Sequence, residues 1–274
     1  MVEVRPDAAS LAPGPWCTPI GHASQIPGQG LPAHLSTRTH GWSSANLGVI
    51  RLDEPTRALS VSQTTLNLLR ECPRCFWFHT KAHVARPRDG WPSVLVRIDE
   101  VVCAYWNRYA RRGELPPMFS GTLQGVPVTP NLEAWYDRVT GLYLTGRLDA
   151  CLKIDGRSFA PVDHKSRGSH PRRISSAYLL QLDLYQLLLE KNGYPSAGYG
   201  VLNYYIPDKC DLSKGLALTV EVSLVNTSTD RALDWLVRAR EVLEMEDPPA
   251  PSDLCLFCRW LVQVNGKFQK LNFR

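Results

Sequence analysis

Apolar residues recur with helical spacing in several stretches of the chain. Ser62, followed by Gln-Thr-Thr-Leu-Asn-Leu-Leu-Arg, has the features of an N-cap and predicts a helix that leads to Cys72. In three further stretches, apolar side chains return every three or four positions and would form one face of a helix. This spacing predicts helices over residues 92–109, 174–191 and 227–245.

Shorter stretches rich in Val, Tyr and Thr predict β-strands. The predicted strands cover residues 121–128, 140–154, 158–166, 198–206 and 216–224. The order is helices, a strand meander, one helix, two more strands and a last helix. This order predicts an α/β domain with a mixed central β-sheet flanked by helices.

The chain of 274 residues, 44% of them hydrophobic, is long enough to bury one core. Residues 1–57 are rich in Pro, Gly, Ser and Ala without a sustained period, so we expect a disordered or loosely attached tail. The expected folded domain is residues 58–262, and residues 263–274 are a C-terminal tail.

The charge and hydropathy of the chain restrict its location and partners. No apolar run approaches the roughly 20 residues of a membrane span, and no secretion signal is visible, so we expect a cytoplasmic protein without membrane contact. The net charge of +5 is compatible with a polyanionic partner. Basic residues cluster at 108–112 and 165–173; the first is equally consistent with a solvated surface, and the second favours phosphate contact.

Two C-x-x-C pairs, Cys72-Pro-Arg-Cys75 and Cys255-Leu-Phe-Cys258, bracket the predicted domain. Together they predict a four-thiolate site that clamps the two ends of the domain. Zinc and an iron–sulfur cluster are both bound by four thiolates. Four unrelated free cysteines or a redox-active thiol pair are the alternatives, and no thioredoxin-like context surrounds either pair.

An acidic constellation lies on two neighbouring predicted strands. Asp163 and Lys165 are two apart and share one strand face. Asp149 precedes the turn between the strands, and a three-residue loop at 155–157 would place it opposite Asp163. A two-residue loop would put Asp163 on the other face. The Asp-Gly sequence favours the three-residue loop with a bulge.

In that register Arg147 lies opposite Lys165, and the intervening residues face the other side of the sheet. We expect this second face to be a buried layer made by Leu148, Ala150, Leu152 and Ile154. His164 also points away from its two neighbours, so its side chain is expected to be packed. Its backbone carbonyl remains able to contact a metal.

Paired aspartates are suitable ligands for Mg²⁺ or Mn²⁺. Cleavage of a phosphodiester needs an activated water and neutralisation of the phosphate charge, and a bound metal supplies both. A nearby lysine can position that water or stabilise the transition state. Gln181 and Tyr185 lie four apart on one helical face and can hydrogen-bond a phosphate or a base. The alternative interpretation is that Asp149, Asp163 and Lys165 form an ordinary ion pair between strands.

These residues resemble a known superfamily. The segments Gly146-Arg-Leu-Asp149, Pro161-Val-Asp163-His-Lys165 and Gln181-Leu-Asp-Leu-Tyr185 are similar to the motifs of the PD-(D/E)XK nucleases. Within that superfamily they are most similar to the RecB-type nucleases and the related CRISPR-associated iron–sulfur nuclease. The resemblance covers roughly residues 60 to 260. It implies a restriction-endonuclease-like core and a metal-dependent DNA nuclease, acting as an exonuclease.

The resemblance also implies roles for individual residues. Asp149 and Asp163 would bind Mg²⁺ or Mn²⁺, and Lys165 would be the catalytic lysine. Gln181 and Tyr185 would match the Q-x-x-x-Y helix of the RecB-type branch. The family usually adds a His or Glu ligand from an upstream helix; here the candidate is Asp99, at the edge of an apolar stripe, and the backbone carbonyl of His164 completes the set.

The resemblance further implies that Cys72, Cys75, Cys255 and Cys258 hold a [4Fe–4S] cluster. The iron–sulfur nucleases commonly place one cysteine near the N-terminus and three near the C-terminus, whereas this chain has two and two. Zinc is therefore the alternative occupant. The implied partners are DNA, as single strands or duplex ends, and a helicase or integrase-type protein.

Two other functions are consistent with the sequence. One is a catalytically inactive DNA-binding or adaptor module of the same fold, which would keep the cysteine site. The other is a zinc-stabilised interaction protein in which the acidic strand has no function.

Overall fold

The computed structural model describes residues 59–87, 92–208, 213 and 215–271, so the expected tail over residues 1–57 lies outside the described residues. The helices are α1 (Gln63–Glu71), α2 (Pro73–Thr80), α3 (Ser93–Ala110), the short 3₁₀ helix η1 (Pro117–Phe119), α4 (Ser176–Lys191), α5 (Thr229–Glu244) and α6 (Leu256–Leu271). The strands are β1 (Ser60–Ser62), β2 (Val126–Pro127), β3 (Trp135–Asp137), β4 (Leu142–Thr145), β5 (Ala150–Ile154), β6 (Ser158–Ser166), β7 (Tyr199–Pro207) and β8 (Leu218–Asn226).

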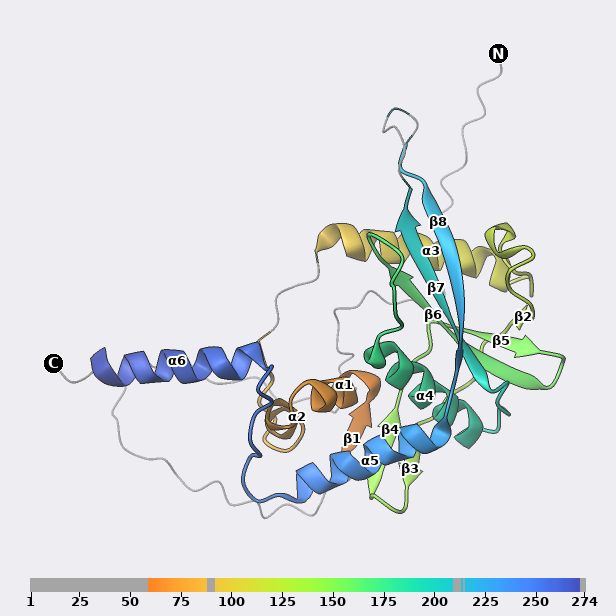
Figure 1. Cartoon of the computed structure of the whole chain (residues 1–274). Coiled ribbons are helices and arrows are strands. Elements are labelled where there is room, and N and C mark those ends of the chain that lie inside the picture. The colour runs from red at the N-terminus through yellow and green to blue at the C-terminus, as the bar shows by residue number, and fades with distance from the viewer. Residues whose placement is uncertain (1–58, 88–91, 209–212, 214, 272–274) are drawn as a thin grey trace, which may run out of the picture.

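The central sheet has five strands in the order β2-β5-β6-β7-β8 (Figure 1). Strands β6 and β7 are parallel and are joined by helix α4, whereas the other neighbouring pairs are antiparallel. A second, small sheet has the order β1-β4-β3. The expected α/β architecture with a mixed sheet flanked by helices is therefore confirmed.

The turn between β5 and β6 has the expected odd length. Ile154 pairs with Ser158, which leaves a three-residue loop, and the same register places Ala150 opposite Val162. Asp155 and Gly156 both have positive φ, at 49° and 69°, and the N–H of Arg157 donates to the carbonyl of Ile154 at 3.0 Å. Asp-Gly is one of the few dipeptides that readily accept positive φ at both positions. If this pairing is continued by one residue beyond Ala150, Asp149 lies opposite Asp163.

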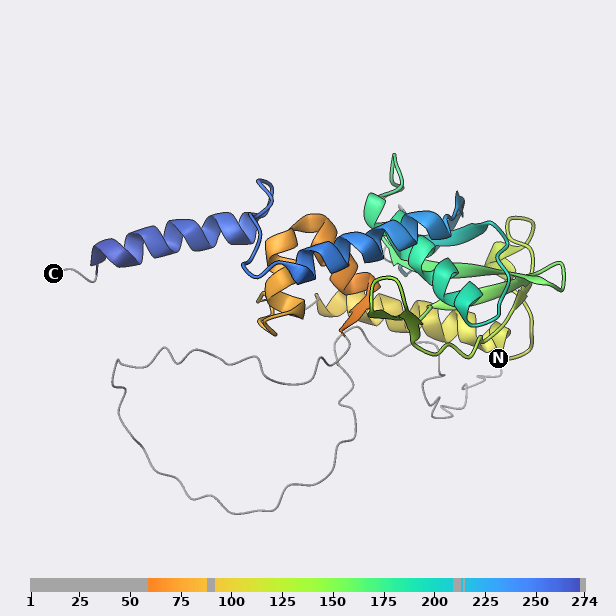
Figure 2. The same cartoon turned by 90° about the horizontal axis from the view of Figure 1, so that it is seen from below.

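Helices cover both faces of the central sheet. Helix α3 packs on one face, where Val102 and Trp106 meet Ala150, Leu152 and other buried strand residues. Helix α4 covers the opposite face, and α5 lies outside α4 (Figure 2). The expected buried layer is confirmed for Ala150 and Leu152, and Ile154 is partly buried against the same cluster.

Leu148 is buried as expected, but it lies on the other face of the sheet. Its side chain packs on the α4 side, in a cluster with Cys151, Tyr185 and Leu189. Regular pairing with β6 begins only at Ala150, so strand alternation does not extend to Leu148.

Helix α4 is enclosed on all sides. All ten residues from Leu180 to Leu189 are buried, because the sheet lies on one side of the helix and α1 and α5 on the other. Gly200 of β7 permits the close approach of helix and sheet, since an added Cβ there would lie 2.9 Å from Leu182 Cδ2. The carboxylate of Asp183 accepts two hydrogen bonds from Arg231, at 2.9 and 2.8 Å, which fix the start of α5 against α4.

Several elements differ from those expected. The predicted strand over residues 140–154 is two strands in two sheets, β4 and β5, separated by Gly146–Asp149. The predicted strand 121–128 shortens to β2. Helix α2 and strand β3 were not predicted, and α6 crosses the expected boundary at residue 262 and continues to Leu271.

Helix α6 projects away from the rest of the molecule in both views (Figures 1 and 2). Its first turns carry exposed apolar side chains, including Leu256, Trp260 and Val262. In the described part of the chain, no helix combines the length and the apolar character that crossing a membrane requires.

Candidate active site and metal centre

Strand β6 brings Asp163 and Lys165 together at the middle of the sheet. The carboxylate of Asp163 is fully buried, and its Oδ2 lies 2.6 Å from Nζ of Lys165. The lysine side chain is 19% exposed. Because the two residues are two apart on one strand, their side chains leave the sheet on the same face, toward α4, as expected.

Gln181 of α4 connects the groups of this site. Its amide nitrogen donates to Asp163 Oδ1 at 2.5 Å, and its amide oxygen accepts from Lys165 Nζ at 3.1 Å. The same amide nitrogen lies 3.1 Å from the hydroxyl of Tyr185, one turn further along the helix. The Gln181 amide thus contacts both members of the ion pair and orients the Asp163 carboxylate.

Asp149 reaches the site from the neighbouring chain segment, immediately before β5. Its Oδ2 accepts a hydrogen bond from the backbone N–H of His164 at 3.1 Å. The side chain is half-buried, in contrast to the enclosed Asp163. The two aspartates therefore converge from adjacent strands, which is the arrangement that the three-residue loop predicts.

The electrostatics of the pair follow from burial and charge. Burial raises the pKa of Asp163, the ammonium of Lys165 opposes the rise, and the charge of Asp149 adds to it. Burial alone would lower the pKa of Lys165, but the carboxylates of Asp163 and Asp149 outweigh it and raise that pKa. The site therefore retains a lysine ammonium whose charge is balanced by carboxylates.

Asp99 lies in the middle of α3 and is half-buried. Burial raises its pKa, the charge of Asp149 raises it further, and the charge of Lys165 lowers it. These effects place the Asp99 carboxylate within electrostatic range of the site. Its neighbour Glu100 pairs instead with Arg97 at 2.7 Å, on a more exposed part of the helix.

The His164 side chain is packed on the opposite face of the sheet. Its ring lies edge-on to Trp106 with centroids 5.0 Å apart, and Nδ1 lies 3.3 Å from the hydroxyl of Tyr205 and 3.4 Å from Nδ2 of Asn203. Burial lowers the pKa of His164 to about 4, so the imidazole is neutral at pH 7. Only its backbone remains available to the acidic site.

Sequence reasoning missed Tyr178, which precedes Gln181 by three residues on α4. Nζ of Lys165 lies 4.9 Å from the centroid of the Tyr178 ring. The available signal was helical spacing, because Tyr178, Gln181 and Tyr185 follow one another at intervals of three and four along one helix face.

The four cysteines meet at the junction of α2 and α6. The sulfurs of Cys72 and Cys258 lie 3.8 Å apart, and the sulfur of Cys75 lies 3.7 Å from that of Cys255 and 3.6 Å from that of Cys258. All four sulfurs lie within 4.8 Å of one another, and all four residues are buried.

Among the described residues, this is the only group of three or more His, Cys, Asp or Glu side chains with ligand atoms so close together. The carboxylate oxygens of Asp99, Asp149 and Asp163 thus do not all lie within 4.8 Å of one another. The acidic site differs in that the ammonium of Lys165 lies beside its most buried carboxylate.

The thiols of the cysteine group differ in how readily they ionise. In Cys255, burial is outweighed by hydrogen bonds from the Cys258 backbone and from the neighbouring thiols, which lower its pKa to about 7. Burial and the neighbouring thiols raise the pKa of Cys75 far above its usual range. Burial also raises the pKa of Cys258, to about 11. Since a metal binds thiolates, binding would release these protons and link the two ends of the domain.

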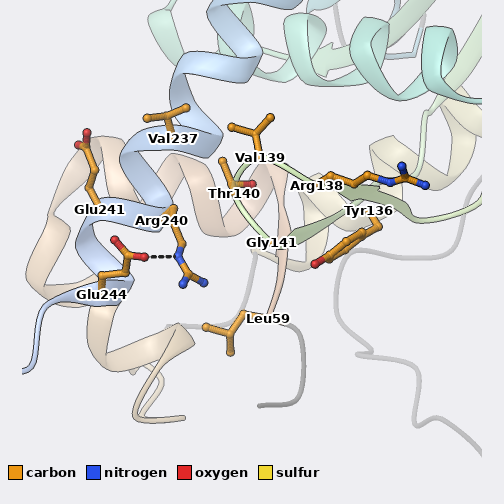
Figure 3. A pocket seen from close by; sticks show the side chains of 10 residues that line it. All are labelled: Leu59, Tyr136, Arg138, Val139, Thr140, Gly141, Val237, Arg240, Glu241 and Glu244. Carbon is orange, nitrogen blue, oxygen red and sulfur yellow. Dashed lines mark hydrogen bonds and ion pairs between the residues drawn. The ribbon is translucent and has the colours of Figure 1, made fainter.

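A separate surface hollow of about 650 Å³ lies between the β3–β4 turn and α5 (Figure 3). Tyr136 and Val237 contribute to its lining, and Arg240 pairs with Glu244 beside it at 2.7 Å. None of the acidic-site residues lines this hollow, so the candidate chemistry lies elsewhere in the molecule.

A family model described as the PD-(D/E)XK nuclease superfamily matches residues 89–262. The chain belongs to this superfamily. Its members are metal-dependent nucleases, so nucleic acid is the class of substrate that membership implies. The match includes Asp99, the two strands of the acidic site and α4, together with the C-terminal cysteine pair.

Other comparisons add little to the family assignment. No curated protein matches the chain. Among solved structures, one titled "Crystal structure of SSO0001" is similar over 69% of this chain and 79% of that chain, with 18% sequence identity and a TM-score of 0.38.

The role of Gln181 can be tested against a matched residue. Gln186 is also buried on α4, but its amide has no hydrogen-bond partner among the described residues. Gln181→Leu is expected to lower the free energy of unfolding by about 1–3 kcal/mol, because Asp163 and Lys165 lose a partner in a buried site. Gln186→Leu is expected to be neutral or stabilising.

Urea unfolding of both variants measures this difference. Equal loss of stability in the two variants would show that the amide of Gln181 does not hold the ion pair.

Proposed function

We propose that this protein is a metal-dependent deoxyribonuclease of the RecB type and that it acts as an exonuclease. The observation that carries the proposal is the buried cluster of Asp163, Lys165 and Gln181, with Asp149 beside it. Even a well-paired buried ion pair is often no more stabilising than apolar residues of the same volume, so stability alone is a weak reason for such a cluster. It is useful where chemistry needs both charges.

The acidic side chains fit a divalent cation. Asp163 Oδ2 is buried, and its charge is balanced by the Lys165 ammonium at 2.6 Å. A carboxylate held in this way can exchange one cation for another. We propose that Asp149 and Asp163 hold Mg²⁺ or Mn²⁺, with Asp99 and the His164 carbonyl as further ligands; these hard oxygen donors suit both ions.

A bound divalent cation would neutralise phosphate charge and make water more acidic. The residues of the chain orient the water and stabilise the charge that develops during cleavage. The Lys165 ammonium lies at the edge of the site, where it can orient the attacking water and stabilise charge that develops on the phosphate. The water oxygen forms the new bond to phosphorus, the bond from phosphorus to one ester oxygen breaks, and the leaving oxygen takes up a proton.

Gln181 and Tyr185 have supporting roles in this proposal. Gln181 keeps the Asp163 carboxylate and the Lys165 ammonium in fixed relation, and Tyr185 limits the movement of that amide. Burial raises the pKa of Tyr185 above its usual range, so its hydroxyl remains a neutral hydrogen-bonding group.

The segment between β6 and α4 supports DNA as the substrate. It begins immediately after Lys165 and Ser166 and carries Arg167, Arg172 and Arg173, of which the last two are exposed. Arginines beside the site can bind the phosphates of a DNA strand. In the first basic cluster, at residues 108–112, Arg112 already pairs with Glu114 at 3.0 Å, which favours an ordinary surface there.

Loss of Lys165 is expected to abolish cleavage. With end-labelled single- and double-stranded DNA and Mn²⁺, Lys165→Ala and Asp163→Asn should each slow cutting by about a hundredfold or more, because charge stabilisation at the phosphate is lost. Lys153→Ala on β5, which lies opposite Phe159 at the far end of the strand, is the control and should cut normally. The product ladder reports polarity and exonuclease action.

Cutting by Lys165→Ala at the wild-type rate would contradict the proposed function. The alternative, a catalytically inactive DNA-binding module, predicts that wild-type protein binds DNA but does not cut it with either metal. The intact acidic cluster favours the enzyme.

We further propose that the four cysteines hold a structural metal centre. Zinc bound by four thiolates at about 2.3 Å places neighbouring sulfurs about 3.8 Å apart. Three sulfur pairs here are separated by 3.6–3.8 Å and the others by no more than 4.8 Å, which favours a single tetrahedral ion. A [4Fe–4S] cluster also takes four cysteines, but it is larger and would require them to move apart.

Loss of one cysteine ligand is expected to destabilise the protein, because metal binding at the four-cysteine site contributes to the free energy of folding. Cys258→Ser should lower the melting temperature and the bound metal content together, because the site then lacks one thiolate. Cys151→Ser is the control, since Cys151 is equally buried but lies outside the cysteine group.

Elemental analysis and visible absorption of anaerobically purified protein accompany this test. We expect about one zinc per chain and no visible band. Four irons and four sulfides would identify the cluster instead, and the absence of both metals would contradict a metal centre.

A further inference from the structure

The position of the Lys165 ammonium depends on more than its carboxylate partner. A lysine side chain carries its ammonium on a flexible stem of four carbons, so the position of the residue on a strand does not by itself fix the ammonium. Here Nζ contacts three groups: Asp163 Oδ2 at 2.6 Å, Gln181 Oε1 at 3.1 Å and the Tyr178 ring at 4.9 Å from its centroid. The ring is the one contact of these three that is neither a carboxylate nor an amide.

The Tyr178 ring is itself well fixed. Tyr178 lies in the first turn of α4, where its N–H donates to the carbonyl of Ser175 at 3.0 Å and the Ser175 side chain caps the helix. On the sheet side, the ring packs beside that of Tyr204, with centroids 6.5 Å apart. Tyr204 pairs with Lys165 across β6 and β7, so the helix and the sheet together define the position of the ring.

The three contacts would respond differently to a divalent cation at Asp163. A cation there would share the carboxylate charge and repel the ammonium, so the ion pair would weaken. Gln181 also binds Asp163, through its amide nitrogen, and would be drawn into any rearrangement of that carboxylate. The Tyr178 ring offers no lone-pair oxygen at its face, yet its quadrupole attracts an ammonium.

We propose that Tyr178 is a positioning residue that keeps the Lys165 ammonium in the active site when Asp163 engages a divalent cation. This inference rests on the proposed nuclease function for its catalytic consequence. The ring does not touch the reacting atoms; it acts through the lysine.

Steady-state kinetics of two substitutions test the proposal. Tyr178→Leu removes the ring and keeps an apolar side chain, whereas Tyr178→Phe keeps the ring and removes only the hydroxyl. With saturating Mn²⁺ and DNA, Tyr178→Leu is expected to lower kcat by about tenfold with KM unchanged, since the cation–π contact is lost. Tyr178→Phe should retain kcat within about twofold. Melting temperatures confirm that both variants are folded.

Three kinetic outcomes would overturn the proposal. The first is wild-type kcat in Tyr178→Leu while Lys165→Ala is inactive. The second is a rise in KM alone, which would assign the ring to substrate binding. The third is an equal loss in the two tyrosine variants, which would assign the effect to the hydroxyl.

A second measurement does not depend on activity. The ε-methylene protons of Lys165 lie near the face of an aromatic ring, so their NMR signal should be shifted upfield. Protein labelled with ¹³Cε-lysine gives this signal, and Lys165→Arg assigns it. In the presence of Mg²⁺, the upfield shift should persist in wild type and Tyr178→Phe and disappear in Tyr178→Leu.

The two measurements separate the proposals. If wild-type protein cuts no DNA, the proposed function fails, and the NMR signal still decides whether the ring holds the ammonium. A Lys165 signal that is the same in wild type and Tyr178→Leu with Mg²⁺ would overturn the positioning role.

Discussion

The buried ion pair between Asp163 and Lys165 constrains much of the surrounding structure. Two charges inside a protein are tolerated only when each is paired and hydrogen-bonded. Lys165 and Gln181 supply this for the carboxylate, and Gln181 can do so only if α4 lies close to the sheet. Gly200 permits that approach, and the enclosure of α4 between the sheet and the outer helices maintains it.

The same constraint explains why the two faces of the sheet differ. The α4 face carries Asp163 and Lys165, whereas the α3 face at the same level carries the neutral, packed His164. The Lys165 ammonium and the Asp163 carboxylate therefore lie on the same side of β6, and Asp149 lies nearby. Under the proposed function this asymmetry has a use, because a bound cation and the lysine ammonium can both act on the phosphate from one face of the sheet.

Local patterns were sufficient to predict the main elements and the register of the site. The Asp155-Gly156 turn defines which residues face each other across β5 and β6, and it is encoded in adjacent residues. Features that depend on distant contacts were not accessible in this way. The contact of Lys165 with Tyr178 exists only because the β6–α4–β7 crossover returns the helix over its own strand. Helix α2 was missed for a different reason. It has only eight residues, which are too few to show a helical period.

The most direct test of the account is to locate a divalent cation at the acidic site. Anomalous X-ray scattering from crystals soaked in Mn²⁺ would show where the ion binds. We predict a manganese ion held by the carboxylates of Asp149 and Asp163, with the Lys165 ammonium still beside the Tyr178 ring. Well-ordered crystals in which manganese avoids both carboxylates, while Lys165 remains paired with Asp163, would contradict the proposed active site.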